Sequence, residues 1–511
     1  MNTRKNFVEA LAIENSKAKT LTENGAVAYA SSGKELVDFN FKLSQYRNMP
    51  ETDIQKDYGK VFFENPLIAV KFAFYVGDIR GGLGERKVFR ACLDWLATNK
   101  PEIACAVLTL VPEYTRWDNV VKLIANNNVK EQALDLIATQ LKMDMSNIYF
   151  EKPISLLAKW MPSENTSSRE TRALAYKVRT GLKMNSKDYR KTLSALRKYL
   201  DVVEVKASSN RWNEINYEAV PSQANIKYND AFFKHDENRR KEYLRALQKG
   251  ETKINASVAQ PHEIVGKYSN WYTAKNYDEA LEQLWKALPS IMLANTLVVR
   301  DGSGSMTCSI KPGSNTSCLH VSTALAIYCS EHNDNMWRNK FITFSRNPKF
   351  IDLSNCKSLH DKLVRTYDED DCSNTDIAKT MRLILNTAIS NNCTQEEMPR
   401  NILIISDMQF DGRYSGAFNW NSTLFEDIAE EYRDAGYELP KIIFWNVHSR
   451  SANNPTLPMQ DNERGLILCS GFSINNMKMF MSDEINPYKI LLEQINDKRY
   501  DAVEQAVKNI I

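Results

Sequence analysis

The sequence predicts an all-α domain followed by an α/β domain with a doubly wound, mostly parallel sheet. From about Asn40 to Leu284, apolar residues recur at helical spacing, and short polar breaks separate the runs. From Thr296 onward, short β-rich runs alternate with helical ones. We therefore expect three parts: an N-terminal extension over residues 1–40, a helical domain over 41–290 and an α/β domain over 291–511.

One predicted helix shows the helical spacing plainly. Its apolar residues recur at i, i+1, i+4, i+5 and i+8, and they are Val88, Phe89, Cys92, Leu93 and Leu96. Many helices of this kind with short turns are typical of a stacked helical array. No strict sequence period is present, so a plain helical domain is the alternative.

Five apolar runs in the second half have the length and composition of buried strands: 296–300, 340–344, 401–406, 441–447 and 465–469. Helical patterns lie between and after them, at 321–332, 376–389, 423–435 and 487–495. Alternation of this kind predicts a parallel sheet whose two faces are both covered by helices.

Composition narrows the class of protein. Of 511 residues, 43% are hydrophobic and 25% are charged, which is ordinary for a globular protein. No run approaches the roughly 18 apolar residues of a membrane span, and the first residues lack the apolar core of a secretory signal. The nine cysteines include no CxxC pair, so neither a zinc site nor a disulfide framework is favoured. We expect a cytoplasmic protein without a membrane partner.

The net charge of the whole chain is only +3, but one segment is strongly basic. Residues 151–250 carry 21 Lys or Arg against 12 Asp or Glu, an excess of +9. On a helix, Arg190, Lys191, Arg197 and Lys198 would form one stripe, at i, i+1, i+7 and i+8. Such an excess favours a polyanion such as RNA, and a solvated helix face is the alternative interpretation. The candidate RNA contacts are Arg169, Arg172, Lys177, Arg179, Arg190, Lys191, Arg197 and Lys198.

Oxygen-bearing side chains follow two of the predicted strands. Asp301-Gly-Ser-Gly-Ser305 comes directly after the strand 296–300, and Asp407 comes directly after the strand 401–406. Thr375 lies in a polar loop before a helix. Carboxylate and hydroxyl oxygens are ligands for a hard cation, and ligands of open α/β sheets bind beyond the carboxyl ends of the strands. We expect Asp301, Ser303, Ser305, Thr375 and Asp407 to hold one Mg²⁺, or another divalent cation such as Mn²⁺ or Ca²⁺.

These three segments resemble the DxSxS…T…D pattern of the metal-ion-dependent adhesion site in von Willebrand factor A domains. A flexible Gly/Ser turn is the alternative for the first segment alone. Asp301 could also be the nucleophile of a phosphatase-like fold, but such sites usually carry a second carboxylate where this chain has Ser303. No P-loop, GxSxG or HExxH motif is present. We therefore expect a protein that is not an enzyme.

Further motifs lie in the helical half. Arg211-Trp-Asn-Glu-Ile-Asn-Tyr-Glu-Ala-Val-Pro-Ser222, with Tyr228 and Phe232 after it, resembles a stretch of the TROVE/Ro group of RNA-binding proteins. The chain resembles even more closely a related family of unknown function, found largely in viruses and plants. The segments that carry this second resemblance are Asp78-Ile-Arg-Gly-Gly-Leu-Gly-Glu-Arg86, Leu157-Ala-Lys-Trp-Met-Pro-Ser163, Ser406-Asp-Met-Gln-Phe410 and Phe444-Trp-Asn446.

The resemblance covers roughly residues 40–480. It implies HEAT-like helical repeats arranged in a ring, joined to a von Willebrand A domain, and binding of structured or misfolded small RNA in a ribonucleoprotein. The closer family carries no function that can be transferred. A protein–protein interaction scaffold, in which the metal engages a partner's carboxylate, is the alternative function.

Overall fold

The computed structural model of the chain describes residues 19–270, 272–344, 347–370, 373, 376–412, 422–450 and 456–511. The chain divides into two compact units, and each unit is built from two separate stretches of sequence. The first combines the described part of Met1–Asp53 with Ala256–Ile495, and the second combines Ile54–Asn255 with Asn496–Ile511. These limits differ from the boundaries expected near residues 40 and 290.

The first unit contains a six-stranded sheet in the order β10-β9-β8-β5-β6-β7. All neighbouring pairs are parallel except β6 with β7, which are antiparallel. The strands are β5 (Thr296–Asp301), β6 (Lys340–Phe344), β7 (Lys349–Asp352), β8 (Asn401–Ser406), β9 (Lys441–Asn446) and β10 (Leu466–Ser470). Every residue of β5, β8, β9 and β10 is buried, as expected for strands covered on both faces.

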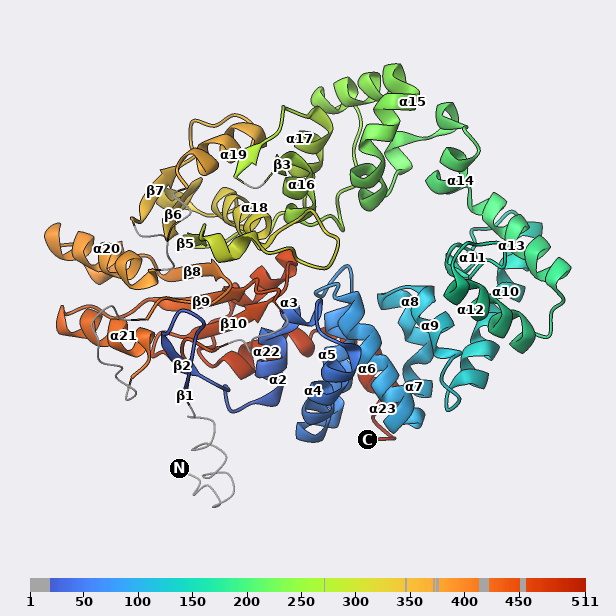
Figure 1. The fold of residues 1–511 in the computed structure, drawn as a ribbon, viewed down its shortest axis with the longest axis horizontal. Helices are drawn as coiled ribbons and strands as arrows, with labels where there is room; N and C mark the ends of the chain where they lie inside the picture. Colours follow the sequence, from blue (N-terminus) through green and yellow to red (C-terminus); the bar gives the residue numbers. More distant parts are fainter. Residues whose placement is uncertain are drawn as a thin grey trace. The chain divides into compact units, whose positions relative to one another are not determined.

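Helices cover both faces of this sheet (Figure 1). Leu297 and Val299 of β5 pack into one apolar cluster with residues of α2, α20 and α21. Arg300 points to the other face, where its guanidinium contacts Thr323 of α18. The helices of this unit are α2 (Glu35–Phe41), α3 (Leu43–Tyr46), α16 (Pro261–Tyr268), α17 (Glu279–Lys286), α18 (Cys318–Glu331), α19 (Leu359–Asp368), α20 (Ile377–Ser390), α21 (Leu424–Asp434) and α22 (Pro487–Ile495).

Segments outside the expected α/β domain complete this unit. Helix α2 packs on the edge strand β10, where the Asn40 side-chain amide donates a hydrogen bond to the carbonyl of Leu468. Helix α16 packs along α18. Two short antiparallel hairpins also belong here: β1 (Lys19–Leu21) with β2 (Val27–Tyr29), and β3 (Ser269–Asn270) with β4 (Thr273–Ala274). The edge of a sheet and the apolar side of a helix both need cover, which explains why these segments join the sheet rather than the helical unit.

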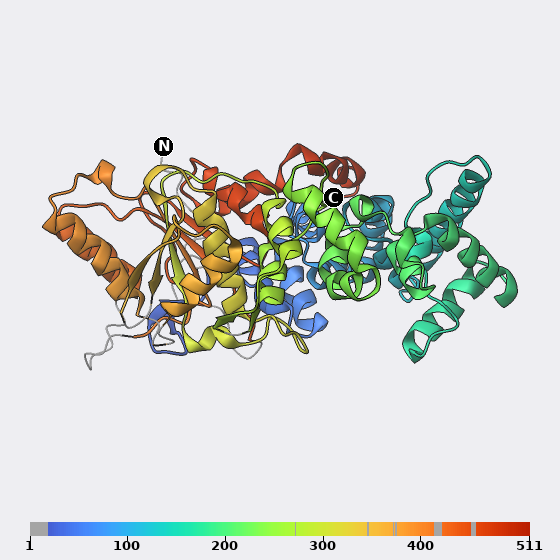
Figure 2. The same ribbon diagram turned by 90° about the horizontal axis from the view of Figure 1, so that it is seen from above.

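The second unit is helical, and its helices follow one another with short connections (Figures 1 and 2). They are α4 (Glu51–Glu64), which begins at the end of the first unit, α5 (Pro66–Gly77), α6 (Arg86–Asn99), α7 (Pro101–Val107), α8 (Val111–Tyr114), α9 (Trp117–Leu123), α10 (Lys130–Tyr149), α11 (Leu157–Trp160), α12 (Arg169–Gly181), α13 (Ser186–Leu200), α14 (Val203–Ser208), α15 (Ser222–Gln248) and α23 (Asp501–Val507). The last helix, α23, packs on α5 and α7, and Glu504 pairs with the buried Lys71 at 2.7 Å.

The predicted order of a helical region followed by a mostly parallel sheet is confirmed. All five predicted strands form, and each predicted helix of the second half overlaps an observed one. The antiparallel edge strand β7 was not predicted. In the parts of the chain that the structure describes, no helix is both long enough and apolar enough to cross a membrane.

Candidate functional site

Asp301 and Asp407 lie at the carboxyl ends of two neighbouring strands. Asp301 is the last residue of β5, Asp407 directly follows β8, and the two strands pair in parallel. From β5 the sheet continues to β6 on one side, and from β8 it continues to β9 on the other. The strand order therefore reverses between the two carboxylates, and such a switch point is where open α/β sheets bind their ligands.

The loop after β5 turns several oxygen atoms toward this point. The Asp301 carboxylate accepts a hydrogen bond from the backbone N–H of Ser303 at 2.9 Å and another from the hydroxyl of Ser406 at 2.6 Å. The hydroxyl oxygens of Ser303 and Ser305 lie 3.0 Å apart. Three of the predicted ligands, Asp301, Ser303 and Ser305, are thus brought together.

Asp407 is buried, and one of its oxygens lacks a protein donor. Its Oδ1 accepts the backbone N–H of Gln409 at 3.1 Å. Its Oδ2 is buried and has no hydrogen-bond partner among the described residues. The next residue, Met408, has a φ of 61°, a left-handed backbone conformation that residues other than glycine rarely adopt. An orphaned carboxylate oxygen and a strained backbone at neighbouring residues are costly, and they are typical of functional sites.

The two carboxylates affect each other electrostatically. Burial raises the pKa of Asp301, and the neighbouring charge of Asp407 raises it further. The hydrogen bonds from Ser406 and Ser303 act in the opposite direction without cancelling the rise. Two buried acids at one point repel one another when both are ionised, so a cation between them would stabilise the ionised pair.

The donor set fits a hard divalent cation. It offers two carboxylates and two hydroxyls, with no nitrogen or sulfur. The fifth predicted ligand, Thr375, lies outside the described residues. Among those described, no group of three His, Cys, Asp or Glu side chains is placed to hold a metal ion. A site here would therefore depend on hydroxyls and on water to complete the coordination of two carboxylates.

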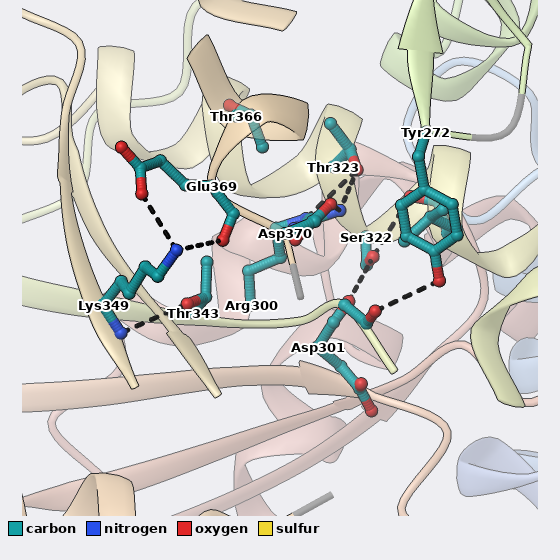
Figure 3. A network of polar contacts seen from close by, with 12 residues as sticks. Tyr272, Arg300, Asp301, Ser322, Thr323, Thr343, Lys349, Thr366, Glu369 and Asp370 are labelled. Atoms are coloured by element: carbon teal, nitrogen blue, oxygen red, sulfur yellow. Dashed lines mark hydrogen bonds and ion pairs between the residues drawn. The ribbon is translucent and has the colours of Figure 1, made fainter. Parts of the chain in front are cut away.

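A buried network holds the loops around Asp301 (Figure 3). The Arg300 guanidinium donates to both carboxylate oxygens of Asp370, at 2.5 and 3.0 Å. A Cβ atom at Gly302 would meet Asp370 at 2.6 Å, so glycine is required for this approach. The Tyr272 hydroxyl donates to the carbonyls of Gly302 and Ser303 at 3.3 and 3.4 Å. Together these contacts fix the backbone on both sides of Asp301.

Sequence reasoning missed Arg300, Ser406 and His448. A signal for Arg300 was present, because an arginine inside a buried apolar run needs a buried acid, but its partner Asp370 lies 70 residues away. His448 follows β9, and both of its ring nitrogens are buried without a partner among the described residues. Burial lowers the pKa of His448, and the charge of Asp407 opposes this shift.

The candidate RNA contacts lie on α12 and α13 of the helical unit and separate into two groups. Five are exposed on the surface: Arg169, Arg172, Lys177, Lys191 and Lys198. Among the described residues, no carboxylate lies within ion-pair distance of these five. They remain candidates for contact with phosphates.

The other three candidates are engaged within the protein, and here the predicted stripe needs correction. Arg197 is half-buried, and its guanidinium donates to the carbonyls of Ala158 and Met161 at 2.9 and 2.7 Å and to the hydroxyl of a neighbouring serine. Arg179 pairs with Glu164 at 2.8 Å, and the exposed Arg190 approaches the same carboxylate at 3.9 Å. Helical periodicity places Arg197 on the same stripe as Arg190. It does not reveal that the side chain of Arg197 turns inward and donates hydrogen bonds to backbone carbonyls.

Comparison with known proteins matches the chain to two domain families and to a viral relative. Residues 22–119 and 127–294, which together make up more than half of the chain, match the family described as Domain of unknown function (DUF2828). Residues 295–509 match Domain of unknown function (DUF7788). A viral relative, "Uncharacterized protein L728" of Acanthamoeba polyphaga mimivirus, is 29% identical over 93% of this chain and 86% of its own length. These matches agree with the expected closeness to a virus-associated family of unknown function, and the chain belongs to the DUF2828 family.

Proposed function

We propose that the sheet unit is a von Willebrand A-type domain that holds one Mg²⁺-class cation through Asp301, Ser303, Ser305, Thr375 and Asp407. The observation that carries this proposal is the pair of buried carboxylates at the switch point, of which Asp407 has an oxygen with no partner among the described residues. A hard cation would relieve the repulsion between the carboxylates and supply the missing partner. It would also present a positive charge to an incoming anionic ligand.

The helical unit, on this proposal, is a HEAT-like array of TROVE/Ro type that binds structured or misfolded RNA. Support comes from charge: between residues 151 and 200 the chain carries twelve Lys or Arg against four Asp or Glu. Five of the twelve are the exposed cations of α12 and α13 without a described acid partner. Unpaired surface cations are available to phosphates, and release of the counterions that surround RNA drives such binding.

RNA binding is tested in two steps on the full chain. The absorbance ratio of protein purified without nuclease shows whether RNA accompanies it. Filter binding with a structured small RNA then compares the wild type with a variant in which Lys177, Lys191 and Lys198 are changed to Glu. We expect at least tenfold weaker binding by the variant, because three phosphate contacts become repulsive. A matched control changes Lys286, Lys311 and Lys357 of the other unit to Glu, because these lysines are also exposed and have no ion-pair partner among the described residues. Equal affinity of both variants and the wild type would refute RNA binding through α12 and α13.

Cation binding is tested separately by calorimetry with Mg²⁺ and Mn²⁺. Asp301→Ala should abolish the binding heat, because it removes the central carboxylate. Asp352→Ala, which removes an exposed carboxylate of β7 in the same unit, should bind as the wild type does. Equal affinity of wild type and Asp301→Ala would show that the site is wrongly assigned.

A protein-binding scaffold is the second candidate function, and the geometry of the cation site favours it. The few protein ligands leave room for the carboxylate of a partner at the metal. In that case an acidic peptide would bind only with Mg²⁺ present and would not bind Asp301→Ala. In either case we propose that the protein is not an enzyme.

A further inference from the structure

Two cysteines face each other just after the candidate cation site: Cys308 in the loop that follows Ser305, and Cys318 at the start of α18. The sulfur atoms of Cys308 and Cys318 lie 3.5 Å apart. The backbone aligns them, because the N–H of Cys318 donates to the carbonyl of Cys308 at 3.0 Å, and Ser309 and Ser317 form an antiparallel bridge beside them. A disulfide has a sulfur separation of about 2.05 Å, so the two atoms need to approach by only about 1.5 Å.

The surroundings of the pair are polar rather than apolar. The Ser449 hydroxyl lies 3.3 Å from the sulfur of Cys308 and 3.1 Å from that of Cys318. The Cys318 thiol also donates to the carbonyl of Val447 at 3.0 Å. These contacts hold both sulfurs beside the chain that leaves β9, within the same unit and next to the site loop.

The two thiols differ in exposure and in acidity. Cys308 is partly exposed, whereas Cys318 is fully buried. The hydrogen bond with Cys318 lowers the pKa of Cys308, and the contact with Ser449 and the positive charge of Arg450 act in the same direction. Burial and the charge of Asp407 raise this pKa without cancelling the decrease. The same contact with Cys308, together with burial, raises the pKa of Cys318. One accessible thiolate beside one buried thiol is the arrangement of an attacking and a resolving cysteine.

We propose that Cys308 and Cys318 form a reversible disulfide when the protein meets hydrogen peroxide. The Cys308 thiolate attacks one peroxide oxygen, the O–O bond breaks, and the released hydroxide takes up a proton to leave as water. The sulfur of Cys318 then attacks the Cys308 sulfenic acid; its thiol proton goes to the departing hydroxide, which leaves as a second water. Both sulfurs are oxidised by one electron each, and one peroxide is reduced to two waters.

Oxidation would change the contacts of the site loop. The disulfide has no S–H donor, so the carbonyl of Val447 loses the hydrogen bond that Cys318 now provides. Cys308 lies three residues after Ser305, so the sulfur movement is transmitted to the loop that carries the candidate ligands. The disulfide itself is independent of the cation proposal and is tested without any metal.

The test counts free thiols in the folded, full-length chain after treatment with equimolar hydrogen peroxide. The protein is quenched with N-ethylmaleimide, and its mass and peptides are measured. The wild type should lose two alkylatable thiols per chain, a linked peptide should contain Cys308 and Cys318, and dithiothreitol should restore both. Cys318→Ser should instead accumulate a sulfenic acid at Cys308 that dimedone traps. Cys308→Ser should keep all of its thiols.

Cys356→Ser is the matched control, because Cys356 is also partly exposed and burial raises the pKa of its thiol. This variant should form the disulfide as the wild type does, and Cys308 should react with peroxide at least about tenfold faster than Cys356. The proposal fails if the wild type keeps all of its thiols, if the linked peptides join other cysteines, or if the linkage joins two chains. The wild-type peptide map decides this even if a variant folds poorly.

Discussion

Arg300 and Asp370 form a fully buried ion pair with two hydrogen bonds. Arg300 directly precedes the candidate ligand Asp301 in β5. Thr323 of α18 accepts from the same guanidinium at 2.7 Å. The pair joins the end of the central strand to the segment that leads toward Thr375. Charge inside the sheet unit therefore serves to hold the loops of the site in place.

Breaking this pair should destabilise the protein strongly. We expect Asp370→Ala to lower the free energy of unfolding by about 3 to 5 kcal/mol, because Arg300 remains buried without its counter-ion. The exposed pair Arg382–Glu431 is the control, and Glu431→Ala should cost less than about 1 kcal/mol. Urea denaturation measures both. If Asp370→Ala unfolds at the wild-type urea concentration, the ion pair does not hold the loop.

Replacing Asp301 by Asn should stabilise the cation-free protein at neutral and higher pH. The folded-state pKa of Asp301 is raised by burial and by Asp407, so the folded protein favours the protonated acid. The contribution of this group to stability is present below its unfolded pKa and is lost as pH rises through its folded pKa. The variant escapes this loss, and we expect it to gain about 1 to 3 kcal/mol at pH 8.

Urea denaturation with a chelator at pH 5 and pH 8 measures this difference. Added Mg²⁺ should stabilise the wild type at pH 8 and leave Asp301→Asn unchanged, since only the wild type binds it. A stability gain of equal size at both pH values would contradict the assignment of the raised pKa to Asp301.

The salt dependence of RNA affinity should distinguish the exposed cations of α12 and α13 from the arginine that is hydrogen-bonded within the protein. On a single-stranded RNA segment, reversing Lys191 and Lys198 to Glu should reduce the slope of log affinity against log salt by about 1.4, or about 0.7 for each lost phosphate contact. Thermal stability should stay unchanged, because both side chains are exposed. Arg197→Glu should instead cost more than about 2 kcal/mol of stability, since it removes three hydrogen bonds to half-buried acceptors. If Arg197→Glu keeps wild-type stability, the arginine is a surface residue after all.

Purified protein should not hydrolyse nucleotides or simple phosphoesters. Ser303 stands where aspartyl nucleophiles usually have a second carboxylate to act as general acid. Phosphate release is measured with Mg²⁺ or Mn²⁺ present. Metal-dependent turnover that is lost in Asp301→Asn would overturn the proposal. If His448→Ala also lost this turnover, the imidazole of His448 would be the general base of the reaction.

Much of the sheet unit could be predicted, because a strand that is buried on both faces appears in the sequence as a short run of apolar residues. The five predicted strands are nearly continuous apolar runs, and the site lies where two of them end. The strand β7 is half exposed, and Phe350 points into solvent, so its pattern resembles a polar loop. For Asp301, Ser303 and Ser305, local spacing was enough to predict that they converge. For Arg300 and Asp370, and for the inward turn of Arg197, the partners are distant in sequence and spacing carries no information about them.

The interleaving of the two units has a consequence for biosynthesis. The hydrogen bond between Asn40 and Leu468 cannot form until Leu468 has been made, 428 residues after Asn40. At usual elongation rates this interval is about 20 to 90 seconds. The helical unit likewise depends on α23, which carries the partner of Lys71 and is made after the whole of the first unit. The first unit is incomplete until residues up to Ile495 have been made, and the second until residues 496–511 have followed, so apolar surface of both is exposed to chaperones until then. A fragment that stops at Asn255 should need residues 496–511 supplied again before its helices are covered.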